Sequence, residues 1–265
     1  MTDVPELNIT RYGEQGSPVV FLHGLFGQGR NWTGIAKTLA AGHQVVLIDL
    51  PDHGRSAWVE HFGFVDVADT IAGVFAADEP VALVGHSLGG KVAMVLALRH
   101  PDLVERLCVV DISPVAYPTV SEFAGYIDAM RALDLGSLHQ RSDAEEALAA
   151  AVPNPVVRSF LLQNLRRDDE RGGNGWRWQP NLEGLHADLP SIGSWPADEL
   201  SGTPPYAGPV LWIAGAESRY ITEEYAPAMT ELFPRHRTVT IKNAGHWVHS
   251  EQPQVFGEVL RRFLA

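Results

Sequence analysis

Ser87 lies at the centre of the sequence Gly-His-Ser-Leu-Gly at positions 85–89, with a glycine two residues away on each side. The apolar run 81–84 precedes this motif and the Ala- and Leu-rich segment 88–100 follows it, so the pattern predicts a strand, a sharp turn and a helix. So tight a turn has no room for β-carbons at the two glycines, and it exposes the serine hydroxyl at its tip. We interpret Ser87 as a nucleophile, in preference to the cap of an ordinary helix.

A second glycine-rich motif, His-Gly-Leu-Phe-Gly at positions 23–27, follows the apolar run 19–22. Backbone N–H groups in such a loop, together with the one after the nucleophile, can bind the oxyanion of a tetrahedral intermediate. The candidate donors are the amides of Phe26, Leu88 and Leu25. Three further residues in these motifs are expected to contact the substrate: His23, Gly24 and His86.

The general base that such a serine needs is expected on a loop near the end of the sequence. Residues 243–247 read Asn-Ala-Gly-His-Trp and lie between the apolar run 238–241 and the helical pattern 255–264. His246 is therefore the candidate base among the 11 histidines. His249 lies three residues further on, but no third ligand and no His-Glu-x-x-His pattern accompanies the pair, so we expect neither a metal nor another cofactor.

Composition sets limits on what else the chain could be. Its 265 residues are 45% hydrophobic and carry a net charge of −12. The apolar content argues against disorder, no run of about 18 apolar residues predicts a membrane span, and the acidic balance argues against a nucleic-acid surface. The lone cysteine, Cys108, excludes an intrachain disulfide. Because residues 1–8 lack the features of a targeting signal, we expect a cytoplasmic monomer or homodimer that acts on a small molecule.

The elements that must position these residues alternate along the chain. Short apolar runs rich in β-branched residues, typical of strands buried on both faces, occur at 19–22, 45–50, 81–84, 107–112, 210–214 and 238–241. Helical patterns occur at 32–41, 65–77, 88–100, 223–233 and 255–264. This order predicts an α/β fold, with a mostly parallel, doubly wound sheet and helices on both faces.

The alternation stops between residues 114 and 206, which contain no clear strand run. Helical patterns at 120–133, 143–151 and 155–167 precede an irregular stretch at 172–205. A segment this long is expected to have structure of its own, and it begins at the carboxyl end of a strand, where open α/β sheets bind ligands. We therefore predict a core formed by residues 1–113 and 207–265, with residues 114–206 inserted as a helical cap, or lid.

Taken together, these motifs resemble those of the α/β-hydrolase superfamily over essentially the whole chain. Residues 49–56 are similar to that family's turn Asp-x-Pro-Gly-x-Gly-x-Ser, with Asp52 where glycine is usual. The family's common pattern puts the catalytic acid after the strand that precedes the histidine, as Gly-x-x-Asp, but residues 215–218 read Gly-Ala-Glu-Ser. Two carboxylates remain as candidates for the acid: Asp111, at the end of an earlier strand, which we favour, and Glu217.

This departure resembles one branch of the superfamily, which comprises small bacterial esterases and acyl-CoA thioesterases together with mitochondrial abhydrolase-domain relatives. In that branch the acid resembles Asp111, and a serine stands at the position of Ser218. The resemblance implies a carboxylic-ester or thioester hydrolase with a triad of Ser87, His246 and Asp111. Ser218 either helps to orient the histidine or is a polar turn residue.

We expect the cap to line an apolar acyl pocket suited to esters of short to medium chain length. Candidate lining residues are Phe123, Tyr126 and Trp178 in the cap and Trp247 outside it. Acyl-CoA thioesters are a further substrate class, for which segment 158–177 offers five arginines against three acidic residues, although such a mixed run is more typical of a solvated helix face. The alternatives are a C–C bond hydrolase or lyase of the same fold and, least favoured, a ligand-binding protein without catalysis.

Overall fold

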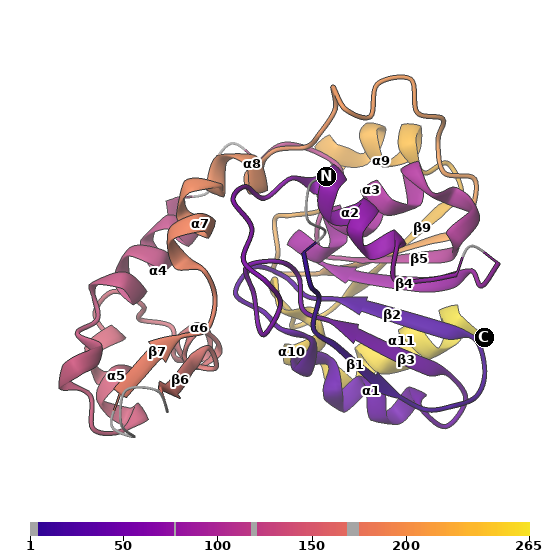
Figure 1. Ribbon diagram of the computed structural model, residues 1–265. Helices are drawn as coiled ribbons and strands as arrows, with labels where there is room; N and C mark the ends of the chain where they lie inside the picture. The colour runs from indigo at the N-terminus through magenta and orange to yellow at the C-terminus, as the bar shows by residue number, and fades with distance from the viewer. Residues whose placement is uncertain (1–4, 77, 118–120, 169–174) are drawn as a thin grey trace.

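The computed structural model describes residues 5–76, 78–117, 121–168 and 175–265, and its centre is a seven-stranded sheet (Figure 1). The strands lie in the order β1-β3-β2-β4-β5-β8-β9, with β1 antiparallel to β3 and every other neighbouring pair parallel. Their bounds are β1 Ile9–Tyr12, β2 Pro18–Leu22, β3 Gln44–Ile48, β4 Val81–His86, β5 Val104–Val110, β8 Val210–Gly215 and β9 His236–Ile241. The predicted mostly parallel α/β sheet is confirmed.

Helices cover both faces of this sheet (Figure 1). One face carries α2 (Phe64–Ala72), α3 (Leu88–Arg99) and α9 (Ala226–Leu232), and the other carries α1 (Thr33–Leu39) and α11 (Pro253–Leu264). Short helical turns connect these elements: Gly29–Trp32, Pro101–Leu103, Glu223–Tyr225 and α10 (Val248–Glu251). Successive side chains of β2 point to opposite faces of the sheet: Val19 packs in the apolar cluster with α1, and Val20 packs in the cluster with α3.

The first strand, β1, escaped the sequence analysis, whereas the six predicted runs all contain or overlap strands. Its four residues, Ile-Thr-Arg-Tyr, are half-buried or exposed at the edge of the sheet. An edge strand buries less apolar surface than a central one, so its sequence lacks the continuous apolar run that marks the others. The five predicted core helices are confirmed with ends that shift by several residues.

Between β5 and β8 the chain leaves the sheet and forms a lobe beside the core, which we call the cap (Figure 1). Its elements are α4 Ser121–Ala132, a helical turn Leu135–Ser137, α5 Arg141–Leu148, α6 Pro155–Leu162, β6 Leu165–Asp168, β7 Gly175–Trp178, α7 Leu182–Ala187 and α8 Leu189–Gly193. A small apolar cluster that includes Leu148, Leu162 and Trp176 is buried between these elements. The cap therefore has a core of its own.

The cap is not wholly helical, and the prediction of a helix over residues 155–167 is wrong in its last part. Helix α6 ends at Leu162, and β6 pairs with β7 as an antiparallel hairpin. Leu165 is fully buried while the side chain of Arg167 lies 4.0 Å from the centre of the Trp176 ring on the facing strand. Cross-strand contacts with a partner that is distant in sequence favour the strand here, and a local helical pattern cannot reveal them.

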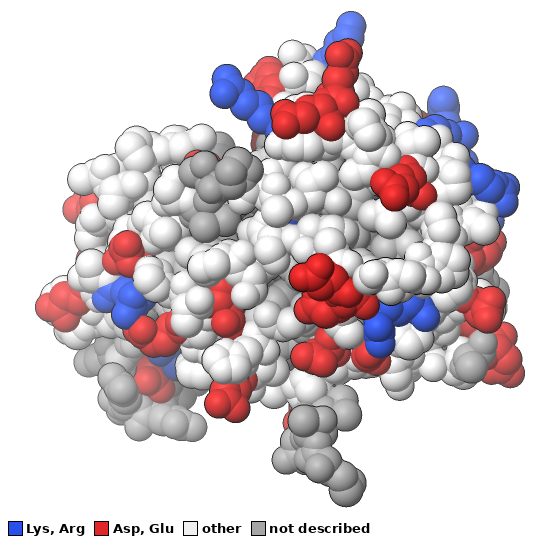
Figure 2. All heavy atoms as spheres, turned by 90° about the horizontal axis from the view of Figure 1, so that it is seen from above, with Lys and Arg blue, Asp and Glu red and all other residues white. Residues whose placement is uncertain are grey.

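Within the described residues, no helix is long and apolar enough to cross a bilayer, and no group of three or more His, Cys, Asp or Glu side chains could hold a metal ion. The face seen from above in Figure 2 carries acidic side chains with basic ones scattered among them. Where this face is described, it forms no continuous basic surface.

Candidate active site

Ser87 occupies a strained turn between β4 and α3. Its backbone has a φ of +52° and a ψ of −117°, a conformation that side-chain-bearing residues rarely adopt. A β-carbon on Gly85 would lie 2.2 Å from the carbonyl oxygen of Gly89, and one on Gly89 would lie 2.5 Å from that of His23. Both contacts are with backbone that cannot move aside, so the two glycines are sterically required, as the motif predicted.

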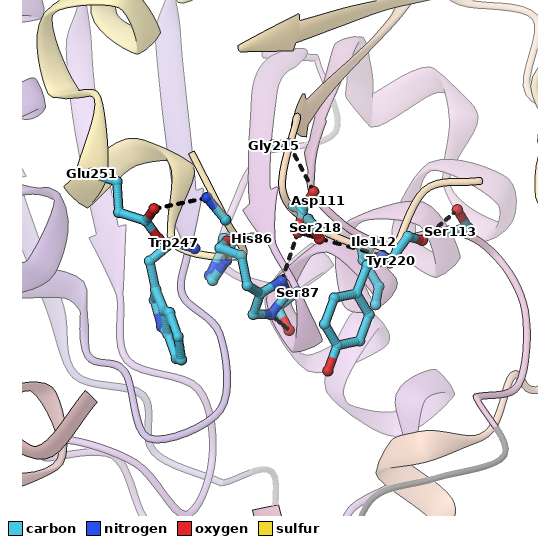
Figure 3. A network of polar contacts seen from close by, with 12 residues as sticks. His86, Ser87, Asp111, Ile112, Ser113, Gly215, Ser218, Tyr220, Trp247 and Glu251 are labelled. Carbon is cyan, nitrogen blue, oxygen red and sulfur yellow. Dashed lines mark hydrogen bonds and ion pairs between the residues drawn. The ribbon is translucent and has the colours of Figure 1, made fainter. Parts of the chain in front are cut away.

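Three side chains form a hydrogen-bonded line at the carboxyl ends of the strands (Figure 3). The Nδ1 atom of His246 lies 2.8 Å from Oδ2 of Asp111, and its Nε2 atom lies 2.9 Å from the hydroxyl of Ser87. An ionised carboxylate only accepts hydrogen bonds, so Nδ1 carries the proton and Nε2 is free to accept from the serine. This tautomer is the one that a general base requires.

The carboxylate in this line comes from the end of β5. Asp111 is completely buried and has a φ of +52°. Its Oδ1 atom accepts a hydrogen bond of 3.0 Å from the amide of Gly215, and its Oδ2 atom accepts one from the hydroxyl of Ser218 as well as that from His246. Since each oxygen has at least one donor, the buried charge is well compensated.

The alternative acid, Glu217, lies elsewhere. It is exposed, and its one hydrogen bond in the described structure is from its backbone amide to the carbonyl of Ala244. The neighbouring Ser218 points to Asp111 instead, and its hydroxyl also accepts a hydrogen bond of 3.3 Å from the amide of Tyr220. The geometry therefore brings Asp111 and Ser218 to His246 and leaves Glu217 out.

His86 lies behind His246. Its Nε2 atom donates to the carbonyl of His246 across 2.8 Å, and the two rings are 4.8 Å apart. Burial, followed by the neighbouring histidines, lowers the pKa of His86 well below its usual value, so the ring is neutral. On the loop's other side, Glu251 accepts from the amides of Gly245 and Trp247 (Figure 3). His86 thus holds the loop that carries His246, although its place in the motif predicted contact with substrate.

The loop 23–27 lies directly against the nucleophile. A β-carbon on Gly24 would lie 3.1 Å from the β-carbon of Ser87. His23 is buried and braces the loop, because its Nδ1 atom donates to the carbonyl of Gly24 and its Nε2 atom accepts from the amide of Leu50. His23 therefore contacts backbone and not the pocket over Ser87.

Phe26, the first candidate oxyanion donor, is held in place by a residue of the cap. Its φ of +61° lies in the left-handed region, so the backbone is not extended here. Asn164, a buried cap residue, donates from Nδ2 to the carbonyl of Phe26 across 2.7 Å. The second candidate donor, Leu88, is the first residue of α3, where backbone N–H groups have no partner within the helix. The third, Leu25, lines the pocket over Ser87.

A small cavity of about 40 Å³ lies over Ser87. Its lining combines the core residues Leu25, Ile112 and Tyr220 with the cap residues Phe123, Leu189 and Ile192. Phe123 was predicted to line the pocket, but the other two cap candidates do not reach it. The hydroxyl of Tyr126 donates to Glu122, and Nε1 of Trp178 donates to the carbonyl of Met130 inside the cap.

Trp247 lies on the other side of the serine from Tyr220 (Figure 3). Its ring is 5.6 Å from that of His246 and 5.9 Å from that of Phe160 on α6. With Phe160 it lines a separate, open cavity of about 370 Å³. Tyr220, which the sequence analysis did not single out, packs its ring 4.2 Å from that of His246.

Lys91 is another lining residue that was not among the predicted site residues. It lies one helical turn after Ser87, is 2% exposed, and donates from Nζ to the carbonyls of Gly193 at 3.0 Å and Ser194 at 2.5 Å. Burial lowers the pKa of Lys91 to about 7, while these carbonyls stabilise its charged form. The four-residue spacing from the nucleophile was the available signal, because residues four apart lie on one helix face.

The beginning of the cap is fastened next to the acid. The amide of Ser113 donates to the hydroxyl of Tyr117, and both hydroxyls donate to the carbonyl of Tyr220, at 3.0 and 2.6 Å. The amide of Tyr117 also donates to the carbonyl of Gly193 at the end of α8. Residues 113–117 are therefore held by both the histidine side of the core and the last cap helix.

A second fastening explains the unusual residue in the turn 49–56. Asp52 has a φ of +64°, which accounts for glycine in the family pattern. Its Oδ1 atom accepts from the side chain of Asn181, and its carbonyl accepts from the backbone amide of the same cap residue. Aspartate tolerates this backbone conformation better than most residues, and its side chain adds one contact with the cap that glycine could not make.

The comparisons with known proteins fit this arrangement. Residues 17–253 match the family described as alpha/beta hydrolase fold. The chain belongs to this family. It is 38% identical to the sn-1-specific diacylglycerol lipase ABHD11 of Mus musculus, over 93% of this chain and 80% of the relative, and 30% identical to esterase YbfF of Escherichia coli (strain K12), over 94% and 93%.

The solved structure of a marine microorganism esterase superposes on this α/β hydrolase with a TM-score of 0.91 and 34% identity, covering 98% of this chain and 99% of that one. The predicted resemblance to esterases and abhydrolase-domain proteins is confirmed. Since relatives and the structural neighbour are named lipase or esterase, the predicted class of carboxylic-ester hydrolases is confirmed as well.

Proposed function

We propose that this α/β hydrolase is a serine esterase that works through an acyl-enzyme. The observation that carries the proposal is the hydrogen-bonded line from Asp111 through His246 to Ser87. A serine hydroxyl is a weak nucleophile until an adjacent base removes its proton, and a base works only when a third group fixes its tautomer. Both requirements are met, because His246 lies 2.9 Å from the hydroxyl of Ser87 and 2.8 Å from the carboxylate of Asp111.

The reaction begins when Ser87 attacks the ester carbonyl and His246 takes the hydroxyl proton on Nε2. The carbonyl electrons move onto oxygen, and the amides of Phe26 and Leu88 donate to this oxyanion, with Leu25 as the alternative donor. Collapse of the intermediate expels the alcohol, which leaves with the proton from His246. Water then attacks the acyl-enzyme with His246 as base, which releases the carboxylic acid and restores the serine.

We assign a short to medium acyl group to the cavity over Ser87, and the support for this assignment is the apolar lining of the cavity. It is small and lined mainly by apolar side chains, so it favours an alkyl chain over a charged one. We assign residues 114–206 the role of a cap that closes this cavity, with Phe123, Leu189 and Ile192 as its contribution. The same chemistry serves thioesters, whose leaving thiolate depends less than an alkoxide on a proton from His246.

The decisive experiment is hydrolysis of a series of p-nitrophenyl esters and acyl-CoA thioesters of increasing chain length. We expect turnover that is highest for short or medium acyl chains. Ser87→Ala should abolish turnover and labelling by a fluorophosphonate, and the exposed Ser201→Ala is the matched control that keeps both. Labelling that persists in Ser87→Ala would contradict the proposal, and inactivity on all esters with activity on a C–C bond substrate would favour that alternative.

A further inference from the structure

A second cavity, of about 230 Å³, lies where the turn 49–56 meets the cap hairpin. It shares no lining residue with the cavity over Ser87. Its lining is polar and includes three arginines, Arg30 and Arg55 from the core and Arg166 from β6. A concentration of positive charge stands out in a chain whose net charge is −12.

These guanidinium groups have no carboxylate partner within the described part of the chain. Arg55 makes no side-chain hydrogen bond or ion pair there, and Arg30 donates to the carbonyl of Gln163 across 2.6 Å. Arg166 donates to the carbonyl of Leu165 and to Oε1 of Gln28, each across a long 3.3 Å. Donors that are strongly charged are thus left with weak or neutral acceptors.

One acidic residue, Asp49, lines the cavity, but its oxygens are already used. Oδ1 accepts from the amide of Gly29 across 2.6 Å, and Oδ2 accepts from the side chain of Asn8 and the amide of Arg55, both across 2.9 Å. The carboxylate therefore supports the turn. With three positive charges and one negative charge, the lining has an uncompensated positive balance.

Burial and mutual repulsion make this balance costly. Burial, followed by the charges of neighbouring arginines, lowers the pKa of Arg166 to about 10 and also lowers that of Arg30. Like charges gathered in a partly buried space destabilise the fold unless an anion offsets them. Because the volume far exceeds the approximately 30 Å³ share of one water, an anion with its own oxygen shell fits.

A chain of side-chain hydrogen bonds connects this cavity to the oxyanion loop. Arg166 donates to Oε1 of Gln28, Gln28 donates from Nε2 to Oδ1 of Asn164 across 3.0 Å, and Asn164 donates to the carbonyl of Phe26. Gln28 and Asn164 are both buried, so the connection is shielded from water. A ligand that draws Arg166 toward itself would therefore act on Gln28, which is connected to Phe26 through Asn164.

We propose that the cavity formed by Arg30, Arg55 and Arg166 is a binding site for a phosphate group, separate from the pocket over Ser87. The planar guanidinium forks match phosphate oxygens, and three forks around one anion supply more donors than a carboxylate can accept. The phosphate comes either from a free anion or from a phosphate-bearing part of an acyl substrate. Binding itself does not depend on hydrolysis.

Binding is tested by calorimetric titration of the full-length protein with inorganic phosphate and with pyrophosphate at low ionic strength. We expect saturable binding that weakens as sodium chloride is added. Arg55→Ala and Arg166→Gln should each weaken it by about tenfold, since each removes one charge-assisted contact. Arg55 is exposed, and its side chain makes no hydrogen bond or ion pair in the described structure, so its loss should leave folding intact.

The matched control is Arg11→Ala, which removes the same charge from the residue next to Thr10, a lining residue of the cavity. Successive strand residues point to opposite faces, so Arg11 is directed away from the cavity. Binding that is absent in the wild type, or that survives unchanged in both Arg55→Ala and Arg166→Gln, would overturn the proposal. Loss of esterase activity in Ser87→Ala with retained phosphate binding would leave it standing.

Two kinetic measurements identify the source of the phosphate. If the site takes a free anion, pyrophosphate changes kcat/KM for an uncharged p-nitrophenyl ester in the wild type and loses this effect in Arg55→Ala. If the phosphate belongs to the substrate, Arg55→Ala raises KM for an acyl-CoA and leaves KM for the p-nitrophenyl ester of the same acyl chain unchanged. Either result supports the site, and the two results separate its sources.

Discussion

The strand ends of the core and the junction between core and cap hold their residues in different ways. At the strand ends, Ser87 and Asp111 are fixed by backbone turns with positive φ, and the glycines beside the serine cannot be replaced. At the junction, the side chains of Asn164 and Lys91 donate hydrogen bonds to backbone carbonyls, and that of Asn181 donates to the carboxylate of Asp52.

We therefore expect substitutions in the two regions to have different effects on activity and stability. A substitution at the strand ends removes a reacting group while the backbone turn remains, so chemistry is lost and the fold survives. A substitution at the junction removes one hydrogen bond among several, so it displaces a loop or shifts stability by smaller amounts. Four predictions test this contrast, and they run from the largest expected effect to the smallest.

Asp111→Asn should lower kcat by about 10⁴-fold. If the amide oxygen keeps the hydrogen bond from Gly215, the amide NH2 faces Nδ1 of His246 and donates to it, so the histidine loses the tautomer that it needs as a base. Turnover of a short p-nitrophenyl ester measures the loss, and the melting temperature shows whether the fold is kept. The matched control is Glu217→Gln, which should retain wild-type kcat because Glu217 is exposed and lies away from His246. The reverse result would move the acid to Glu217.

Asn164→Leu should lower kcat by up to about 100-fold, because a displaced Phe26 amide no longer meets the oxyanion. KM for a short ester should change little, since Asn164 does not line the cavity over Ser87. Gln163→Leu is the control. It removes the hydrogen bond that the Asn31 side chain donates to the Gln163 side chain, and neither residue belongs to the oxyanion loop 23–27. An equal loss of kcat in both variants would show that the hydrogen bond from Asn164 to Phe26 has only a structural role.

Ser218→Ala should lower kcat by about tenfold and move the acid limb of the kcat/KM profile to higher pH. Without the hydroxyl, the negative charge of Asp111 is less compensated and favours protonated His246 more strongly. Ser113→Ala, which loses a hydrogen bond to the Tyr220 carbonyl but none to Asp111, should leave the profile in place. An unshifted profile in Ser218→Ala would make Ser218 a turn residue.

Lys91→Met should change how stability depends on pH. The pKa of Lys91 is lowered to about 7 in the fold, against about 10.4 in an unfolded chain. Between these values the unfolded chain binds more protons, so wild-type stability rises with pH, by at most about 1.4 kcal/mol per pH unit, and falls as pH is lowered toward 7. Lys91→Met should lack this slope, as measured by urea unfolding from pH 7 to 9.

The exposed Lys37→Met on α1 is the control for that experiment and should keep the wild-type slope. If the unfolding free energies of Lys91→Met and the wild type run parallel with pH, the buried lysine does not titrate in this range. The carbonyls of Gly193 and Ser194 bind the ammonium form and would then be the reason.

The sequence was most informative where steric rules act locally. The glycines around Ser87 and the buried strand runs depend on near neighbours, so their patterns predicted both the turn and a mostly parallel α/β sheet. The sequence favoured Asp111 but left Glu217 as an alternative, because both follow strands and the choice depends on which strand end faces His246. That relation belongs to the folded sheet, where β4 and β5 are neighbours.

The cap was predicted less well for the same reason. Its hairpin is stabilised by pairing between Leu165 and Trp178, residues whose local patterns favour no strand. Trp178 is a large aromatic residue in a predicted lining segment, yet its hydrogen bond to Met130 keeps it inside the cap. Of the five arginines in segment 158–177, Arg166 alone lines the cavity at the junction, while Arg158 pairs with Glu145 and Arg171 lies outside the described residues.

The fastening of residues 113–117 limits how substrate can enter. Ser113 and Tyr117 bind the Tyr220 carbonyl, two residues from the Ser218 that supports the acid. If the cap opened by moving residues 113–117, it would pull on the segment that includes Ser218 and disturb the hydrogen bonds of Asp111 with Ser218 and His246. We therefore expect substrate entry to leave this side closed. The separate, open cavity lined by Trp247 and Phe160 lies on the other side of the serine from Tyr220, so widening it would not disturb the support of the acid.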